Sequence, residues 1–184
     1  ERILQRDTWL EILQKFVFLK KETVEDEYGR SRRKPTLIFP RFHQWEAVTQ
    51  MLAAVREEGA GASYLIEHSA GSGKTNTIAW TAHRLLSTYG ADEQRVFDSV
   101  IVVTDRTVLD DQLQEAVRQI ERTSGTVVAV DRKNLGGEAT SKSALVKQSL
   151  LQGNRIIVVT LQTFPAVLEL LKGDSTLAGR TYAV

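Results

Sequence analysis

Apolar residues near the start of the chain recur at the spacing of an amphipathic helix. The stripe predicts a helix over residues 7–20 and consists of Trp9, Ile12, Leu13, Phe16 and Leu19. A single helix cannot bury such a stripe, so we expect it to pack on another element. The charged residues 21–35 that follow end at a proline and indicate a linker. We therefore interpret residues 1–35 as an N-terminal helix and charged linker, with the helix either an arm or the tail of a preceding region.

From residue 36 onward, apolar runs of strand length alternate with helical patterns. The predicted strands lie at residues 63–67, 99–103, 126–130 and 155–159, and a further strand opens at Tyr182. A helix from Phe42 to about Gly59 precedes the first of them, and helices separate the others. Because each strand is an uninterrupted apolar run, residues 36–184 are predicted to form an α/β domain: a parallel sheet with helices on both faces. Ligands of such sheets bind beyond the carboxyl ends of the strands.

A glycine-rich loop follows the first predicted strand. Residues 68–75 read His-Ser-Ala-Gly-Ser-Gly-Lys-Thr, the pattern of a phosphate-binding loop with histidine in place of its first glycine. Lys74 would reach the β- and γ-phosphates of a nucleotide, and the Thr75 hydroxyl would coordinate Mg²⁺. The backbone N–H groups predicted to bind the phosphates are those of Ser69, Ala70, Gly71, Ser72, Gly73 and Asn76. A glycine–serine turn that merely contains Gly-Lys-Thr is the alternative, but the flanking strand and helix favour the phosphate loop.

Composition narrows the chemistry further. The 184-residue chain has no cysteine, which excludes disulfides and cysteine-ligated zinc, and no stretch has the length of a membrane span. The net charge is only +1, so a nucleic-acid partner cannot be argued from overall charge. An acidic run at residues 25–27 precedes a basic run formed by Arg30, Arg32, Arg33 and Lys34. The two runs could form a solvated linker whose charges offset each other, or the basic run could form a phosphate-binding patch. We favour the linker.

Hydrolysis of ATP at such a loop needs an acidic residue at the end of a neighbouring strand to hold Mg²⁺. Asp105 and Asp131 each end an apolar run, but an arginine follows each and opposes metal binding. The strand that opens at Tyr182 is the better candidate, and its acidic end would lie beyond Val184. We therefore expect a lobe truncated before the end of its metal-binding strand (Walker B), able to bind nucleotide but nearly inactive as an ATPase by itself.

Three further segments permit a family comparison. Arg41-Phe-His-Gln44 resembles the adenine-reading Q motif of superfamily 2 helicases and translocases. The resemblance implies that the Gln44 amide pairs with adenine and that Arg41 lies over the ring or near a phosphate. Segments 102–106 and 160–164 resemble the motifs of these motors that hold a nucleic-acid backbone. The implied DNA contacts are Thr104, Asp105, Arg106, Thr160 and Gln162. Alone, each segment also suits an exposed helix face or an ordinary strand-end cap.

Residues 39–184 also contain motifs that are more specific than those shared by the whole superfamily. Ile-Glu-His-Ser-Ala-Gly-Ser-Gly-Lys-Thr-Asn, Val-Val-Thr-Asp-Arg and Val-Thr-Leu-Gln-Thr-Phe resemble the restriction (R) subunit of type I restriction–modification enzymes. The resemblance implies the first RecA-like lobe of an ATP-dependent double-stranded DNA translocase and endonuclease subunit. It also implies modification and specificity subunits as partners, no membrane, and the cytoplasm of a bacterium or archaeon. The three histidines, His43, His68 and His83, are scattered and do not read as metal ligands.

Three other functions stay open at the level of sequence. A helicase from another superfamily 2 branch, acting on DNA or RNA, shares the same fold and site. A small-molecule P-loop kinase shares the phosphate loop, but it leaves Arg41 and Gln44 unexplained and needs an acceptor site and an arginine-rich lid. A nucleotide-binding interaction module would use the loop without any motor role.

Overall fold

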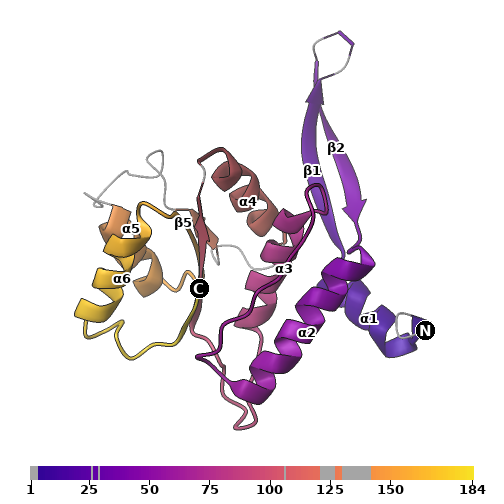
Figure 1. The fold of residues 1–184 in the computed structure, drawn as a ribbon. Coiled ribbons are helices and arrows are strands. Elements are labelled where there is room, and N and C mark those ends of the chain that lie inside the picture. The colour runs from indigo at the N-terminus through magenta and orange to yellow at the C-terminus, as the bar shows by residue number, and fades with distance from the viewer. Residues whose placement is uncertain (1–3, 26, 29, 106, 121–126, 130–141) are drawn as a thin grey trace.

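The computed structural model describes residues 4–25, 27–28, 30–105, 107–120, 127–129 and 142–184 (Figure 1). In chain order its elements are α1 (Arg6–Lys15), β1 (Phe18–Glu25), β2 (Ser31–Ile38), α2 (Phe42–Glu58), α3 (Lys74–Leu86), β3 (Ser99–Thr104), α4 (Thr107–Ile120), β4 (Val127–Ala129), α5 (Lys142–Leu151), β5 (Ile156–Thr160), α6 (Phe164–Gly173) and β6 (Tyr182–Ala183). The strand expected to open at Tyr182 is confirmed. None of the helices described is long and apolar enough to cross a membrane.

The central sheet has four strands in the order β4-β5-β3-β6, and all its pairs are parallel. Alternate residues of its strands face opposite sides, as the pleat requires. Val100 and Val102 of β3 join the core formed with α2, α3 and α4, whereas Ile101 packs with α5 and α6. The predicted fold class is therefore confirmed: an α/β lobe of RecA-like character whose parallel sheet carries helices on both faces.

The N-terminal region differs from its prediction. Helix α1 ends at Lys15, and the segment expected to be a linker belongs to an antiparallel hairpin formed by β1 and β2. The register runs from Phe18 opposite Ile38 to Glu25 opposite Ser31. In Figure 1 this hairpin extends away from the body of the molecule. The extended conformation of this segment depends on pairing between two strands, and the apolar spacing within one segment does not reveal that pairing.

Helix α1 packs against α3 as expected, but with only part of its stripe. Ile12 and Phe16 are buried, whereas Trp9 keeps 40% of its surface exposed. The indole N–H of Trp80 on α3 donates to the Phe16 carbonyl at 2.8 Å. An ion pair of 2.8 Å between Arg84 on α3 and Glu11 adds a second attachment. The N-terminal helix is thus part of the same core as the sheet.

The strand predicted at residues 63–67 is wrong. These residues adopt no regular secondary structure, and Leu65 keeps 96% of its surface exposed. Among the described residues, no backbone hydrogen bond joins the segment to a neighbouring strand. A groove of about 640 Å³ instead separates residues 59–64 from β6, the last strand of the sheet on this side. An apolar run predicts strand character, but a strand forms only where a partner is within hydrogen-bonding distance.

Candidate nucleotide-binding site

Two glycines give the loop before α3 a backbone that other residues rarely adopt. The φ angles are 72° at Gly71 and 85° at Gly73, both in the left-handed region. The Gly73 carbonyl accepts the N–H groups of Asn76 and Thr77 at 3.0 and 3.3 Å, which closes the first turn of α3. The helix then begins at Lys74, so the predicted loop leads directly into a helix N-terminus. This is the geometry that the glycine pattern predicts for an anion site.

Two side chains at the start of α2 hold the carbonyl oxygens of this loop. The Gln44 amide donates to the carbonyls of Ser72 and Gly73 at 3.3 and 2.9 Å. The Nε2 atom of His43 lies 3.1 Å from the Ser72 carbonyl. Because a carbonyl can only accept, His43 is the donor in this bond. These bonds join residues that lie about thirty positions apart in the chain.

Arg41 completes this arrangement by donating to the Gly71 carbonyl at 3.4 Å. We call Arg41, His43 and Gln44, with the loop carbonyls that they hold, the α2–loop clamp. In a trans peptide the N–H points opposite to the C=O, so clamped carbonyls direct the following N–H groups away from α2. The N–H groups of Gly73, Lys74 and Thr75 have no acceptor within the described part of the chain. They are therefore available to a phosphate at the positive end of α3.

The predicted ligand fits the residues present. Lys74 is exposed, and Thr75 and Asn76 are half-buried in the first turn of α3. Upstream, Ser69 and Ala70 are exposed. An ammonium group, a hydroxyl and free backbone N–H groups converge at one helix end, which is the donor set that MgATP needs. No three His, Cys, Asp or Glu side chains of the described residues gather into a metal site elsewhere.

The Gln44 side chain forms more hydrogen bonds within the protein than the sequence suggested. Its side chain is only 2% exposed, and its Oε1 accepts the Arg41 N–H at 2.8 Å. Both N–H groups of the amide are engaged with loop carbonyls, so a two-bond match to adenine is not available in this arrangement. One lone pair of Oε1 remains. A base that met this lone pair would have to offer a donor, as the amino group of adenine does and the carbonyl of guanine does not.

Replacing Gln44 by alanine is expected to weaken GTP binding roughly tenfold, because the loop carbonyls lose their donors, and to weaken ATP binding by a larger factor. Titration of both nucleotides against the wild type and the variant checks this. An unchanged GTP affinity would contradict the clamp, and equal losses for both nucleotides would contradict base selection by Gln44.

His43 and His68 contact each other, which sequence reasoning missed. Their rings meet edge to face with centroids 5.2 Å apart. The Nδ1 of His68 lies 3.5 Å from the Ser72 hydroxyl, so the histidine that replaces the first glycine packs behind the loop. The signal that could have found His43 is its place beside Gln44 in the first turn of α2. His83 lies elsewhere, with Nε2 2.7 Å from the Val117 carbonyl of α4.

Four of the residues predicted to contact DNA lie at the carboxyl ends of two neighbouring strands. Thr104 of β3 is paired with Thr160 of β5, and the structure buries both. The Thr160 hydroxyl is 3.0 Å from that of Thr163, so it stabilises the turn into α6. Asp105 and Gln162 are exposed at the same edge of the sheet. Arg106, and Asp131 on the other predicted strand end, lie outside the described residues.

A groove of about 1170 Å³ borders the helix end that carries Thr75 and Asn76. Its other walls are β1 of the hairpin, from residue 20 to residue 25, and α4. The Gln119 amide of α4 donates to the Lys21 carbonyl at 3.4 Å, which ties the two walls together. The hairpin that the sequence did not predict therefore stands directly beside the phosphate loop.

Comparison with known proteins gives two findings. The sequence model of the SWI2/SNF2 ATPase family matches residues 43–177. A similar curated protein is the putative type I restriction enzyme MjaVIIP endonuclease subunit of Methanocaldococcus jannaschii, which is 31% identical over 122 residues. The match covers 65% of this chain and 10% of that protein, so the chain spans about a tenth of the relative's length.

Proposed function

Because the chain belongs to the SWI2/SNF2 ATPase family, we propose that it is the first ATP-binding lobe of a motor that translocates double-stranded DNA in the restriction subunit of a type I restriction enzyme. The family supports an ATP-binding superfamily 2 motor. The name of the relative and the resemblance of residues 39–184 support the restriction role. In such an enzyme the lobe would work with a second lobe, a nuclease region, and modification and specificity subunits.

The observation that carries the proposal is the α2–loop clamp. Side chains from the Q-motif-like segment hold the loop carbonyls, and the N–H groups of Gly73, Lys74 and Thr75 have no acceptor among the described residues. A phosphate loop alone would suit many nucleotide-binding proteins, including small-molecule kinases. A small-molecule kinase leaves unexplained the contact between this loop and the segment that begins at Arg41, which resembles the Q motif of superfamily 2 motors.

We assign the site residues as follows. Lys74 neutralises the charge on the γ-phosphate, and the Thr75 hydroxyl takes one position on Mg²⁺. The backbone from Ser69 to Thr75 surrounds the phosphates; the Asn76 N–H, which was predicted to take part, is not one of the donors because it is bonded to the Gly73 carbonyl. Arg41 and Gln44 hold the loop and favour adenine. Bound MgATP would supply the free energy of phosphate cleavage, and closure of the cleft between two lobes would convert it into movement along DNA.

DNA would pass over the carboxyl edge of the sheet. Asp105 and Gln162 are exposed there, while Thr104 and Thr160 are buried at the same strand ends. We keep Arg106 in this proposed contact. Helix α1 and the base of the hairpin share the core of α2 and α3, so the division at residue 35 is proposed as a functional boundary and not as a break in packing.

Replacing Lys74 by alanine tests the nucleotide site. We expect MgATP affinity to fall roughly 10- to 100-fold, because a charge-assisted contact to phosphate is lost. The fold should be unaffected, since Lys74 is exposed. Calorimetric titration measures the affinity, and Lys172→Ala, which removes an exposed cation from α6, is the matched control. An unchanged affinity in the Lys74 variant would remove the basis for calling this loop a nucleotide site.

A further inference from the structure

The hairpin formed by β1 and β2 separates charges that the linear sequence places side by side. In sequence, the acidic residues 25–27 directly precede the basic residues from Arg30 to Lys34. The register sets Glu25 opposite Ser31 and sets Arg32 opposite Val24. Residues directly opposite each other in an antiparallel pair share one face, so Glu25 and Arg32, one step apart, point to opposite faces. The expected mutual offset of charge therefore does not occur between Glu25 and Arg32.

Arg32 and Lys34 form a basic pair on one face of β2. Residues two apart on a strand point the same way and lie about 6.6 Å apart. Glu22 stands opposite Lys34, but its carboxylate forms an ion pair with Lys20. Within the described residues neither Arg32 nor Lys34 forms an ion pair, and both side chains are exposed. Two cations on the same strand thus lack an acidic partner.

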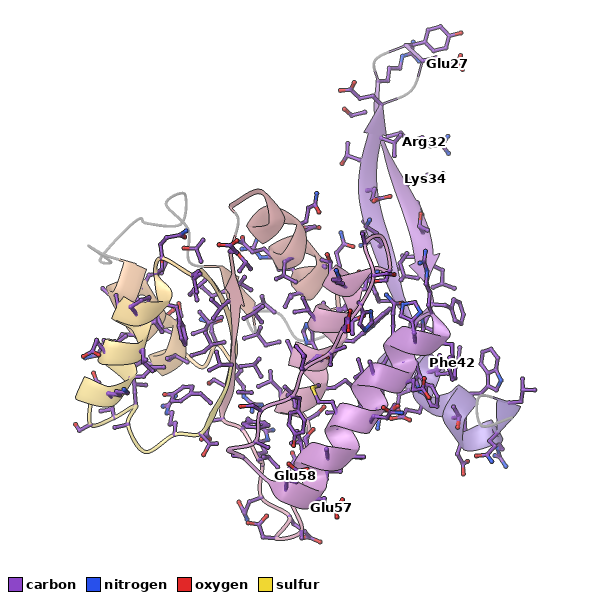
Figure 2. The ribbon with its side chains drawn as sticks, viewed as in Figure 1. Glu27, Arg32, Lys34, Phe42, Glu57 and Glu58 are labelled. Atoms are coloured by element: carbon purple, nitrogen blue, oxygen red, sulfur yellow. The ribbon has the colours of Figure 1, made fainter. Side chains whose placement is uncertain are left out.

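This basic pair lies on β2 opposite Glu22 and Val24, two of the β1 residues that line the groove beside Thr75. Figure 2 shows Arg32 and Lys34 on β2, between Phe42 at the start of α2 and Glu27 at the tip of the hairpin. At its base the hairpin is anchored, because Phe18 and Ile38 pack against the core and β1 borders the groove that ends at Thr75. A ribbon anchored at the nucleotide site, with two exposed cations that form no ion pair among the described residues, is suited to hold a large anionic partner.

We propose that Arg32 and Lys34 on the β1–β2 hairpin bind phosphates of a DNA duplex next to the phosphate loop. A two-stranded ribbon fits the width of a major groove, and arginine and lysine contacts to phosphate position a protein without reading sequence. The overall charge of +1 cannot attract DNA, so a local pair of this kind is needed. The inference rests on the proposed DNA-motor function and adds a contact outside the strand-end residues of the sheet.

The test measures duplex DNA binding by this chain as a function of salt, using fluorescence anisotropy. In the double variant Arg32→Gln, Lys34→Gln we expect the slope of log affinity against log salt to fall by about 2, because each lost phosphate contact removes about 0.9. Affinity at low salt should drop roughly tenfold. The control Arg56→Gln, Lys172→Gln removes the same charge from exposed positions on α2 and α6 and should change neither quantity.

Each other outcome is decisive. Equal effects in both double variants would show that the hairpin cations act only through the net charge of the chain. Unchanged DNA binding would indicate that these cations contact a protein partner instead. Either result overturns the inference. If the wild type binds MgATP but no duplex, the inference and the DNA part of the proposed function both fail. If it binds duplex through the hairpin but no MgATP, the inference stands and the motor function fails. Matching thermal midpoints of the variants establish that the fold is intact.

Discussion

Replacing Gly73 by alanine lowers MgATP affinity by roughly 100-fold, whereas replacing Gly71 lowers it by roughly 10-fold. Both glycines have positive φ angles, of 85° and 72°, so alanine pays about 1–2 kcal/mol of backbone strain at either position. Only at Gly73 does a Cβ meet another atom, the Gln44 Nε2 at 2.6 Å; at Gly71 nothing lies within 4 Å. Comparison of the two alanine variants therefore separates the affinity lost through backbone strain from the affinity lost through contact with the clamp.

The contact at Gly73 is costly because the Gln44 amide cannot move without losing bonds. Its nitrogen donates to two loop carbonyls and its oxygen accepts the Arg41 N–H. Displacing a buried amide sacrifices about 1 kcal/mol for each such bond and shifts the loop population away from its binding conformation. Titration with MgATP measures the loss, and thermal unfolding reports on the fold.

A double-mutant cycle makes this prediction specific. With Gln44 already replaced by alanine, the atom that meets the new Cβ is gone, so Gly73→Ala should then cost no more than Gly71→Ala. Additive losses would show that Gly73 acts independently of Gln44. Equal losses for the two single glycine variants would show that backbone strain alone determines the affinity.

Replacing Trp80 by alanine lowers the free energy of unfolding by about 3–5 kcal/mol. Trp80 on α3 is fully buried, and its ring centroid lies 5.8 Å from that of Phe16 and 6.0 Å from that of Phe18. Its indole N–H also donates to the Phe16 carbonyl. One side chain therefore joins the phosphate-loop helix to the end of α1 and to the base of the hairpin. Denaturant unfolding followed by circular dichroism measures the change.

Two control variants resolve the causes of this destabilisation. Trp80→Phe keeps an aromatic ring but removes the hydrogen bond, so we expect a smaller loss of about 1–3 kcal/mol. Trp9→Ala removes the same side chain from a position on α1 that is 40% exposed, and its effect should be well below that of Trp80→Ala. A loss below about 1 kcal/mol for Trp80→Ala would mean that α1 and the hairpin contribute little to the stability of the core.

Much of the fold and the central part of the site could be predicted from the sequence because their signals are local. Apolar runs mark β3 and β5, a helical stripe marks α2, and the pattern Gly-Ser-Gly-Lys-Thr carries its own backbone requirement. The positive φ angles at Gly71 and Gly73 follow from that pattern. The start of β6 could also be predicted, because its two residues have strand character.

Other features depended on contacts between distant segments. The run at residues 63–67 has strand composition but lacks a partner, so it forms no strand. The hairpin depends on a register between β1 and β2, and the burial of Thr104 and Thr160 depends on neighbouring strand ends and helices. None of these can be obtained from the composition of one segment.

By itself, the sequence determined the α/β class, the glycine-rich loop and the helix that follows it, because these arise from periodicity and backbone chemistry within a few residues. Only the tertiary structure decided that Arg41, His43 and Gln44 hold the loop carbonyls, and that a basic ribbon stands beside Thr75. Those arrangements bring together residues tens of positions apart, and their energies come from hydrogen bonds and packing that exist only once the chain has folded.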